Sequence, residues 1–464
     1  MKRIAVAAIA RSTFDLVMAQ EMASSAFRIL SDLDIDLIGS PDLLLDGEAA
    51  ATAATEWTDA DLDALVLIQA SFADSTVSAA LAGTTDAPAV LWAFPEERTG
   101  GRLRINSLCG INLAGFALAQ KGRPYRWIYR HPDDPLARDD LRVVLTGPQI
   151  PSSPVPPVAP EPAAEFRAEQ LRERLLESRV GIIGDHPDGF EPCAYDAGEL
   201  EATTGVVAVA VPLPRLFARA ASAPPEAVGS VREHLARSLS GLDDVDQVSL
   251  DQSLRLHVGL RGIVDEEQLN AVATRCWPEC FTEFGAAACS PQSLLGDEGV
   301  PACCEADAFG TVTSLALQWL TDSPTFVADL VDLDFESDTG VFWHCGLAPL
   351  SLADPEAVPA AALHSNRAKP LLNEFPLKPG RVTLARFSQS SGSMRLVIGG
   401  GEMLRAPLAF GGTAGVLRFD RPAVDVLSTV MAEGLEHHYG IGYGDVRAEL
   451  YALADQLELE VVGL

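Results

Sequence analysis

Short apolar runs alternate with amphipathic stretches through residues 1–150. The apolar runs have the length of buried strands, and the stretches between them repeat their apolar residues at helical spacing. The predicted strands are Ile4–Ile9, Ile35–Ile38, Ala64–Ile68, Ala89–Phe94 and Tyr125–Tyr129, and the predicted helices cover residues 15–31, 74–83 and 108–121. Strands that alternate with helices in this way indicate βαβ units and a doubly wound parallel sheet in an N-terminal α/β domain.

A proline-rich segment, PSSPVPPVAPEP at residues 151–162, interrupts this pattern. Because proline removes a backbone donor and fixes φ, the segment supports neither a helix nor a central strand, and we expect a domain boundary there. The α/β pattern resumes over residues 163–324, which we interpret as a second doubly wound domain. Its predicted elements are helices at residues 162–178 and 225–240 and strands at Val180–Ile183, Val206–Val211 and Leu254–Leu260.

Residues 325–464 have a different sequence pattern, with short stretches of alternating apolar and polar residues separated by glycine and proline. This pattern is typical of an antiparallel sheet or small barrel. The predicted elements include strands at Arg381–Phe387, Met394–Ile398, Leu404–Ala409 and Gly415–Phe419, a helix at Val446–Leu457 and a final strand. The predicted fold class is therefore α/β, with two doubly wound domains followed by a C-terminal antiparallel β-barrel-like domain.

The charge balance excludes some partners. The 464 residues include 34 Lys and Arg against 65 Asp and Glu, which gives a net charge of -31. The negative charge of the chain would repel the phosphate backbone of a nucleic acid and attract a divalent cation. We therefore expect no nucleic-acid partner. No run of about 18 uncharged apolar residues occurs, and we expect no membrane partner. Arg11 and Asp15 interrupt the first apolar run, which we interpret as a strand rather than a secretion signal, and we expect a cytoplasmic protein.

The eight cysteines are expected to be reduced thiols, because the chain is large and carries no recognisable secretion signal. Cys276 and Cys280, and the adjacent Cys303 and Cys304, could suggest zinc. No second spaced pair completes a four-ligand set, so a structural zinc site is not expected.

Glu305 lies at the entrance of a predicted amphipathic helix. Glu305 and Asp307 could simply be carboxylates that the positive helix N-terminus favours, and that interpretation stays open. Asp329 differs, because period-two alternation over residues 325–335 places it on the apolar face of a predicted strand, with Asp332 and Asp334 on an opposite, solvated face. A carboxylate on an apolar face must be paired, protonated or bound to a cation, so Asp329 is a candidate functional residue.

Histidines are a further kind of candidate ligand beside the carboxylates. His344 ends the next predicted strand, and His437 and His438 precede the last predicted helix. Two carboxylates with imidazole make a hard site that suits Mn²⁺ or Mg²⁺ better than structural zinc. The sequence alone does not bring these residues together.

These segments resemble the L-fucose isomerase and L-arabinose isomerase superfamily. In L-fucose isomerases a Thr-Glu-Asn-Asp segment is followed, after a helix, by Phe-Ala-Asp, and Cys304-Glu305-Ala306-Asp307 and Val327-Ala328-Asp329 are similar to both without a gap. The pair His437-His438 resembles the His-His of arabinose isomerases. The resemblance implies an L-fucose isomerase-like fold and a Mn²⁺ cofactor, or Mg²⁺ or Co²⁺, with ligands Glu305, Asp329, His438 and His344.

The N-terminal region adds to the resemblance. Ala8-Ile9-Ala10-Arg11 is similar to the Gly-Ile-Arg segment of fucose isomerases, whose arginine reaches substrate across a subunit boundary. A homo-oligomer with shared active sites is therefore implied. The residues that the resemblance implies for substrate binding are Arg11, Trp92, Asn106, Arg123 and His437.

The implied activity is a metal-dependent interconversion of an aldose and its ketose through a cis-enediol(ate). Glu305 and Asp329 would be the catalytic acid and base, in an order that the sequence leaves open. One hypothesis for the sugar substrate is an L-fucose-like or D-arabinose-like sugar. Another is sulfoquinovose, a sulfonated hexose, for which the available cationic donors are Arg11, Arg102, Arg104 and Arg123. A non-catalytic sugar-binding or regulatory protein is a further hypothesis, since similar α/β layers also build sugar receptors.

Overall fold

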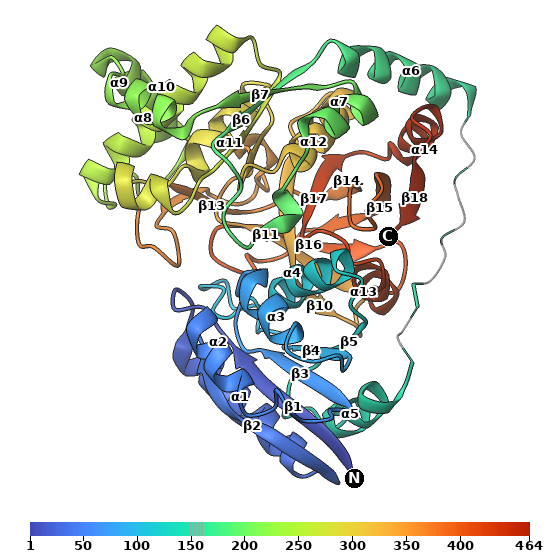
Figure 1. The fold of residues 1–464 in the computed structure, drawn as a ribbon. Helices are drawn as coiled ribbons and strands as arrows, with labels where there is room; N and C mark the ends of the chain where they lie inside the picture. Colours follow the sequence, from blue (N-terminus) through green and yellow to red (C-terminus); the bar gives the residue numbers. More distant parts are fainter. Residues whose placement is uncertain (149–150, 153–154, 156–157, 159–160) are drawn as a thin grey trace.

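Three β-sheets organise the chain (Figure 1). The structure is a computed structural model that describes residues 1–148, 151–152, 155, 158 and 161–464. Half of the residues in the segment 151–162, where the domain boundary is expected, lie outside the described residues. The predicted fold class is confirmed, because two α/β layers with parallel sheets precede an antiparallel barrel. No helix in the described part of the chain has both the length and the apolar character needed to cross a membrane.

The first sheet is parallel, with the strand order β2-β1-β3-β4-β5. Its central strands β3 and β4 are buried along their whole length because helices cover both faces, which explains their unbroken apolar sequence. The strands are β1 (Lys2–Ile9), β2 (Ile35–Leu44), β3 (Ala64–Gln69), β4 (Ala89–Ala93) and β5 (Tyr125–Tyr129). The helices are α1 (Leu16–Ser31), α2 (Gly47–Ala54), α3 (Ser75–Ala82), α4 (Ser107–Gln120) and α5 (Ala137–Thr146).

The second sheet is also parallel, with the order β7-β6-β8-β9. Its strands are β6 (Arg179–Ile183), β7 (Val207–Val211), β8 (Ala271–Thr274) and β9 (Ala302–Cys304). The helices of this region are α6 (Pro162–Leu176), α7 (Ala197–Thr204), α8 (Leu213–Ala221), α9 (Pro225–Ser238), α10 (Gln247–Glu267), α11 (Cys289–Asp297) and α12 (Ala308–Thr321), with short helical turns at Glu191–Cys193 and Cys280–Phe284.

The strand predicted at Leu254–Leu260 is wrong, because this segment lies inside α10. Leu250, Leu254 and His257 are buried at helical spacing on the face of α10 that turns inward. A window of seven residues is too short to separate this spacing from a buried strand.

The third sheet is mixed and mainly antiparallel, and six of its strands close into a barrel because β15 also pairs with β16. Its order is β12-β13-β16-β11-β10-β17-β14-β15-β18. The strands are β10 (Phe326–Asp334), β11 (Thr339–His344), β12 (Ala360–Ala362), β13 (Leu372–Pro376), β14 (Gly380–Ser388), β15 (Arg395–Leu404), β16 (Thr413–Phe419), β17 (His438–Tyr443) and β18 (Glu460–Gly463). The helices are α13 (Ala423–Ala432) and α14 (Arg447–Gln456), with a short turn at Leu350–Leu352.

Two further predictions about this region are wrong. The strand predicted at Leu404–Ala409 does not exist, since β15 ends at Leu404 and the chain then crosses to β16 as a loop. Asp332 does not face solvent, because the regular alternation along β10 is broken by a register shift between Leu330 and Asp332 in its pairing with β11. Asp332 is 3% exposed and accepts hydrogen bonds from Arg98 Nε at 2.7 Å and Tyr129 Oη at 2.6 Å, so the N-terminal sheet covers this face of the barrel.

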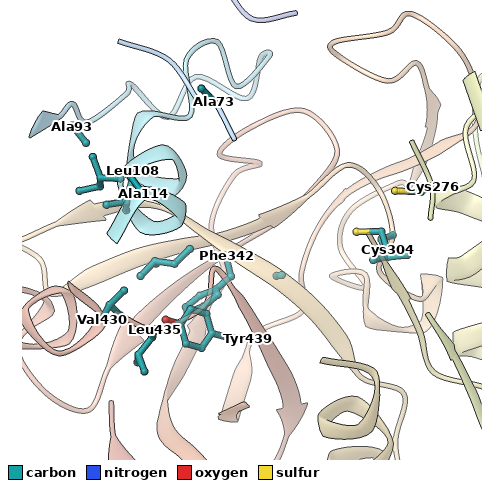
Figure 2. Packing of buried hydrophobic residues seen from close by; sticks show 14 of the residues in the cluster. Ala73, Ala93, Leu108, Ala114, Cys276, Cys304, Phe342, Val430, Leu435 and Tyr439 are labelled. Carbon is teal, nitrogen blue, oxygen red and sulfur yellow. The ribbon is translucent and has the colours of Figure 1, made fainter. Parts of the chain in front are cut away.

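Helix α4 joins the first sheet to the barrel. It is buried over nearly its whole surface and contacts both β10 and α13. Figure 2 shows Leu108 and Ala114 of α4 in the same cluster as Val430, Leu435 and Tyr439 of the C-terminal region. This shared core fixes the N-terminal sheet against the barrel, and it also includes residues of the second sheet. The ends of the three sheets can therefore contribute to one site.

Candidate active site

Glu305 follows β9 in a strained turn. Glu305 and Ala306 have φ values of 60° and 54°, in the left-handed region that costs non-glycine residues about 1–3 kcal/mol and is frequent at functional sites. Asp307, not Glu305, caps α12, because its Oδ1 accepts a hydrogen bond from Gly310 N at 2.9 Å. The helix-start interpretation therefore applies to Asp307, and the Glu305 side chain lines a cavity.

The structure brings Glu305, Asp329 and His438 together. Asp329 on β10 lies directly opposite His438 on β17 in the antiparallel register. The Nε2 atom of His438 is 3.4 Å from Asp329 Oδ1 and 3.7 Å from Glu305 Oε2. The neighbouring His437 approaches the same carboxylate, with its Nε2 at 3.1 Å from Glu305 Oε2.

The donor atoms of this group fit a divalent cation. His438 Nδ1 is 2.8 Å from Asp307 Oδ2, and Asp307 is itself held by an ion pair with the buried Arg386. A carboxylate that orients an imidazole in this way is a common support for a metal ligand. His438 Nε2 and Asp329 Oδ1 are buried and lack a hydrogen-bond partner. Two buried lone-pair atoms at this separation require a proton or a cation between them.

The charges of the group stabilise one another. Burial disfavours the ionised form of Glu305, but the hydrogen bond with His437 and the charge of His438 outweigh it and hold the pKa of Glu305 at about 2. Burial also disfavours a charged His438, yet the hydrogen bond with Asp307 and the charge of Asp329 raise the pKa of His438 to about 9. Anionic surroundings that favour a proton on His438 also favour a bound cation.

His344 lies beside this group, but its ring nitrogens are engaged elsewhere. Its Nδ1 accepts a hydrogen bond from Cys345 N at 2.8 Å, and its Nε2 is 2.7 Å from Cys304 Sγ. Burial lowers the pKa of His344. Cys304, His344 and His438 form a second group whose atoms could hold a metal, beside the group of Cys193, Glu305, His437 and His438. The prediction of His344 as a ligand stays a prediction.

The carboxylates of Glu305 and Asp329 line a cavity whose space, including the part open to solvent, is about 660 Å³. It lies where the carboxyl ends of both parallel sheets face the barrel. Arg11 follows β1 and Phe72 follows β3, while Trp277 follows β8 and Glu305 follows β9. The barrel contributes Asp329 from β10. Ligand sites of open α/β sheets commonly form at such strand ends.

Three of the predicted substrate-binding residues line this cavity, namely Arg11, Asn106 and His437. Asn106 is 4% exposed, and its Oδ1 has no hydrogen-bond partner, so it is free to accept one from a ligand.

Trp92 and Arg123 do not line the cavity. Trp92 is fully buried in the core of the first sheet, where its Nε1 donates to Arg130 O at 2.9 Å. Arg123 follows α4 at its far end and donates to backbone carbonyls of Ala82 and Thr85. The position of Trp92 within a predicted strand did not show that its side chain packs in the core of the first sheet, away from the end of the strand.

Several cavity residues were not predicted from the sequence. Trp277 donates from Nε1 to Glu305 Oε1 at 3.2 Å, and its ring packs edge-on against Phe190 with centroids 4.9 Å apart. His364 and Arg367 come from the loop between β12 and β13. The polar run His364-Ser365-Asn366-Arg367 within an apolar region was a signal that could have identified that loop.

The comparisons with known proteins agree with this geometry. Residues 5–143 match the family described as fucose/sulfoquinovose isomerase, N-terminal domain, and residues 343–464 match that described as L-fucose isomerase, C-terminal domain. A sulfoquinovose isomerase of Alkalicoccus urumqiensis is 30% identical over 98% of this chain and 97% of its own length. Sulfoquinovose isomerases of Priestia megaterium and a Clostridium species are each 28% identical, over 97% and 99% of this chain and 97% and 98% of their own lengths.

Proposed function

The chain belongs to the L-fucose isomerase-like superfamily and is an aldose–ketose isomerase, and from this premise we propose that it isomerises sulfoquinovose with the help of a divalent cation. Relatives that carry the name sulfoquinovose isomerase are similar to the chain over nearly its whole length. The observation that carries the proposal is that the side chains of Glu305, Asp329 and His438 meet beside the cavity, which Glu305 and Asp329 line, and that Asp329 Oδ1 and His438 Nε2 are buried without a hydrogen-bond partner among the described residues.

The proposal assigns each of the polar side chains named below a role in proton transfer, in positioning or in metal binding. Isomerisation moves one proton between C1 and C2 and another between their oxygens, and Glu305 and Asp329 are the groups that transfer them. His437 and Trp277 hydrogen bond to the two oxygens of Glu305 and hold that carboxylate in place. Asp307 fixes the ring of His438. A divalent cation held by Glu305, Asp329 and His438 would stabilise negative charge on the substrate oxygens.

Turnover of a sugar panel tests the proposal. The protein is stripped of metal with EDTA and then supplied with Mn²⁺, Mg²⁺ or Co²⁺, and ketose formation from sulfoquinovose, L-fucose and D-arabinose is followed by NMR. We expect conversion of sulfoquinovose with metal and its loss with EDTA. Turnover that EDTA leaves unchanged contradicts the metal requirement. Preference for L-fucose or D-arabinose contradicts the proposed substrate, and sugar binding without any turnover favours the sugar-binding hypothesis.

We also propose that the chain assembles as a homo-oligomer, on the strength of the family resemblance, and that it acts in the cytoplasm. Arg123, which the resemblance implied for substrate binding, does not line the cavity of its own chain, so it has no role at that cavity. Light scattering coupled to size-exclusion chromatography tests the assembly. A mass near 49.2 kDa, that of one chain, contradicts it.

A further inference from the structure

Two arginines in the cavity lack the partners that arginines in this chain otherwise have. The side chains of Arg11 and Arg367 line the cavity and are half-buried, and among the residues that the structure describes neither guanidinium group has a hydrogen-bond acceptor or a carboxylate at ion-pair distance. Every other buried or half-buried arginine among the described residues donates to a carboxylate or a backbone carbonyl.

This lack of partners is unusual for so acidic a chain. Acidic residues outnumber basic ones by 65 to 34, so carboxylates are plentiful as partners. A guanidinium has five N–H donors, and removing them from water without acceptors is unfavourable. Burial lowers the pKa of Arg11, and the charge of Arg367 adds to this, while the charges of Asp74 and Glu305 oppose it in part. An anionic ligand would relieve both the missing hydrogen bonds and the repulsion between the two cations.

Trp277 contacts both arginines and Glu305. Its ring centroid is 4.5 Å from Cζ of Arg11 and 5.1 Å from Cζ of Arg367, which are cation–π distances. Its Nε1 donates to Glu305. The indole therefore contacts Glu305 through its N–H and both guanidinium groups through its ring, and among the described residues no ion pair joins Glu305 to either arginine. The two cations and the carboxylates of Glu305 and Asp329 line one cavity together with this aromatic ring.

We propose that Arg11 and Arg367 together bind the sulfonate of the substrate and determine the preference for a sulfonated hexose. The inference rests on the proposed function and adds the residues that recognise its substrate. A sulfonate carries three oxygens around one sulfur, so it accepts hydrogen bonds from two guanidinium groups at once. With the sulfonate on these arginines, the other end of the hexose lies toward Glu305 and Asp329.

Substitution of each arginine tests the assignment. Arg11→Gln and Arg367→Gln are each expected to lower kcat/KM for sulfoquinovose by about 10- to 100-fold, mainly through KM, because each removes hydrogen bonds to a charged group. The loss should be smaller on the neutral analogue 6-deoxy-D-glucose, which has no sulfonate to accept such bonds. Arg104→Gln is the matched control, because Arg104 is exposed and ion-paired with Asp15 outside the cavity.

The outcomes separate this inference from the proposed function. If wild-type protein converts sulfoquinovose and the Arg11 and Arg367 variants match Arg104→Gln, the sulfonate assignment is overturned while the function stands. Glucose 6-phosphate tests the other tetrahedral oxyanion, and its conversion with a kcat/KM equal to that of sulfoquinovose overturns the sulfonate preference. Calorimetry with EDTA-treated protein measures binding without turnover. Sulfoquinovose binding that is weakened by Arg367→Gln supports the assignment even if no aldose is converted.

Discussion

At the scale of single residues, Glu305 offers the sharpest test of the chemistry. Glu305→Gln keeps the size of the side chain but removes the charge and the proton-transferring group. We expect kcat with sulfoquinovose to fall by about 10²- to 10⁴-fold, the usual contribution of a general acid or base. Ketose formation measured by NMR gives the rate. The control is Glu283→Gln, an exposed carboxylate, and a Glu305→Gln rate within threefold of that control would rule out the assigned role.

Asp307 supports the site through its contacts with His438 and Arg386. Asp307→Asn can still cap α12, but it leaves Arg386 buried without a counter-charge and weakens the hold on His438. We expect the free energy of unfolding to fall by about 3–5 kcal/mol, and metal affinity to fall by about 10- to 100-fold. Denaturant unfolding and calorimetric metal titration measure the two effects. Asp196→Asn, at the exposed cap of α7, should change neither, and equal effects from both variants would contradict the argument.

The sequence was informative about some site residues and silent about others. Asp329 stands out because a carboxylate within an apolar alternation is costly unless it is compensated. Its meeting with His438 depends on the register between β10 and β17, which local patterns do not encode. Trp277 and Arg367 are ordinary residues in their own segments and become significant only when the loops after β8 and β12 face each other.

At the scale of elements, the local sequence pattern predicts a strand that is buried on both faces or a helix that begins at a cap. The apolar runs at β1, β3 and β5 agree with the observed strands within a few residues. Helix α10 was misread because its apolar residues fill a short window, and α13 was not predicted. The solvated face expected for β10 was wrong because Tyr129 of β5 and Arg98 of the loop after β4 cover it. Element contacts that are distant in sequence decide such cases.

The packing of α10 against α8 allows a prediction about stability. A Cβ at Gly259 would lie 3.0 Å from Ala220 N and 3.2 Å from Leu216 Cδ1, whereas a Cβ at Gly229 in α9 meets nothing within 4 Å. We expect Gly259→Val to lower the free energy of unfolding by about 1–3 kcal/mol through overpacking. Gly229→Val should raise it by a few tenths of a kcal/mol, because valine favours a helix more than glycine does. Denaturant unfolding of both variants decides, and equal effects would contradict the close approach of α8 and α10.

At the scale of the whole molecule, the cavity depends on three sheets being held in one arrangement. The first sheet supplies Arg11, the second supplies Glu305, and the barrel supplies Asp329, whose neighbour His438 lies behind it. Helix α4 and the shared core keep the first sheet on the barrel (Figure 2). A ligand that bridges Glu305 of the second sheet to the barrel should therefore stabilise the folded arrangement of both.

Metal binding should be visible as global stabilisation. A ligand that binds only the folded state adds about 2.7 kcal/mol to the free energy of unfolding when its concentration is 100 times its Kd. We expect Mn²⁺ to raise the melting temperature of EDTA-treated protein, as followed by calorimetry. The double variant Glu305→Gln, Asp329→Asn should lose this increase, because it removes the two ionised ligands from the second sheet and the barrel. If that variant is stabilised by Mn²⁺ as much as wild type, the ion binds elsewhere, since these carboxylates cannot then be its ligands.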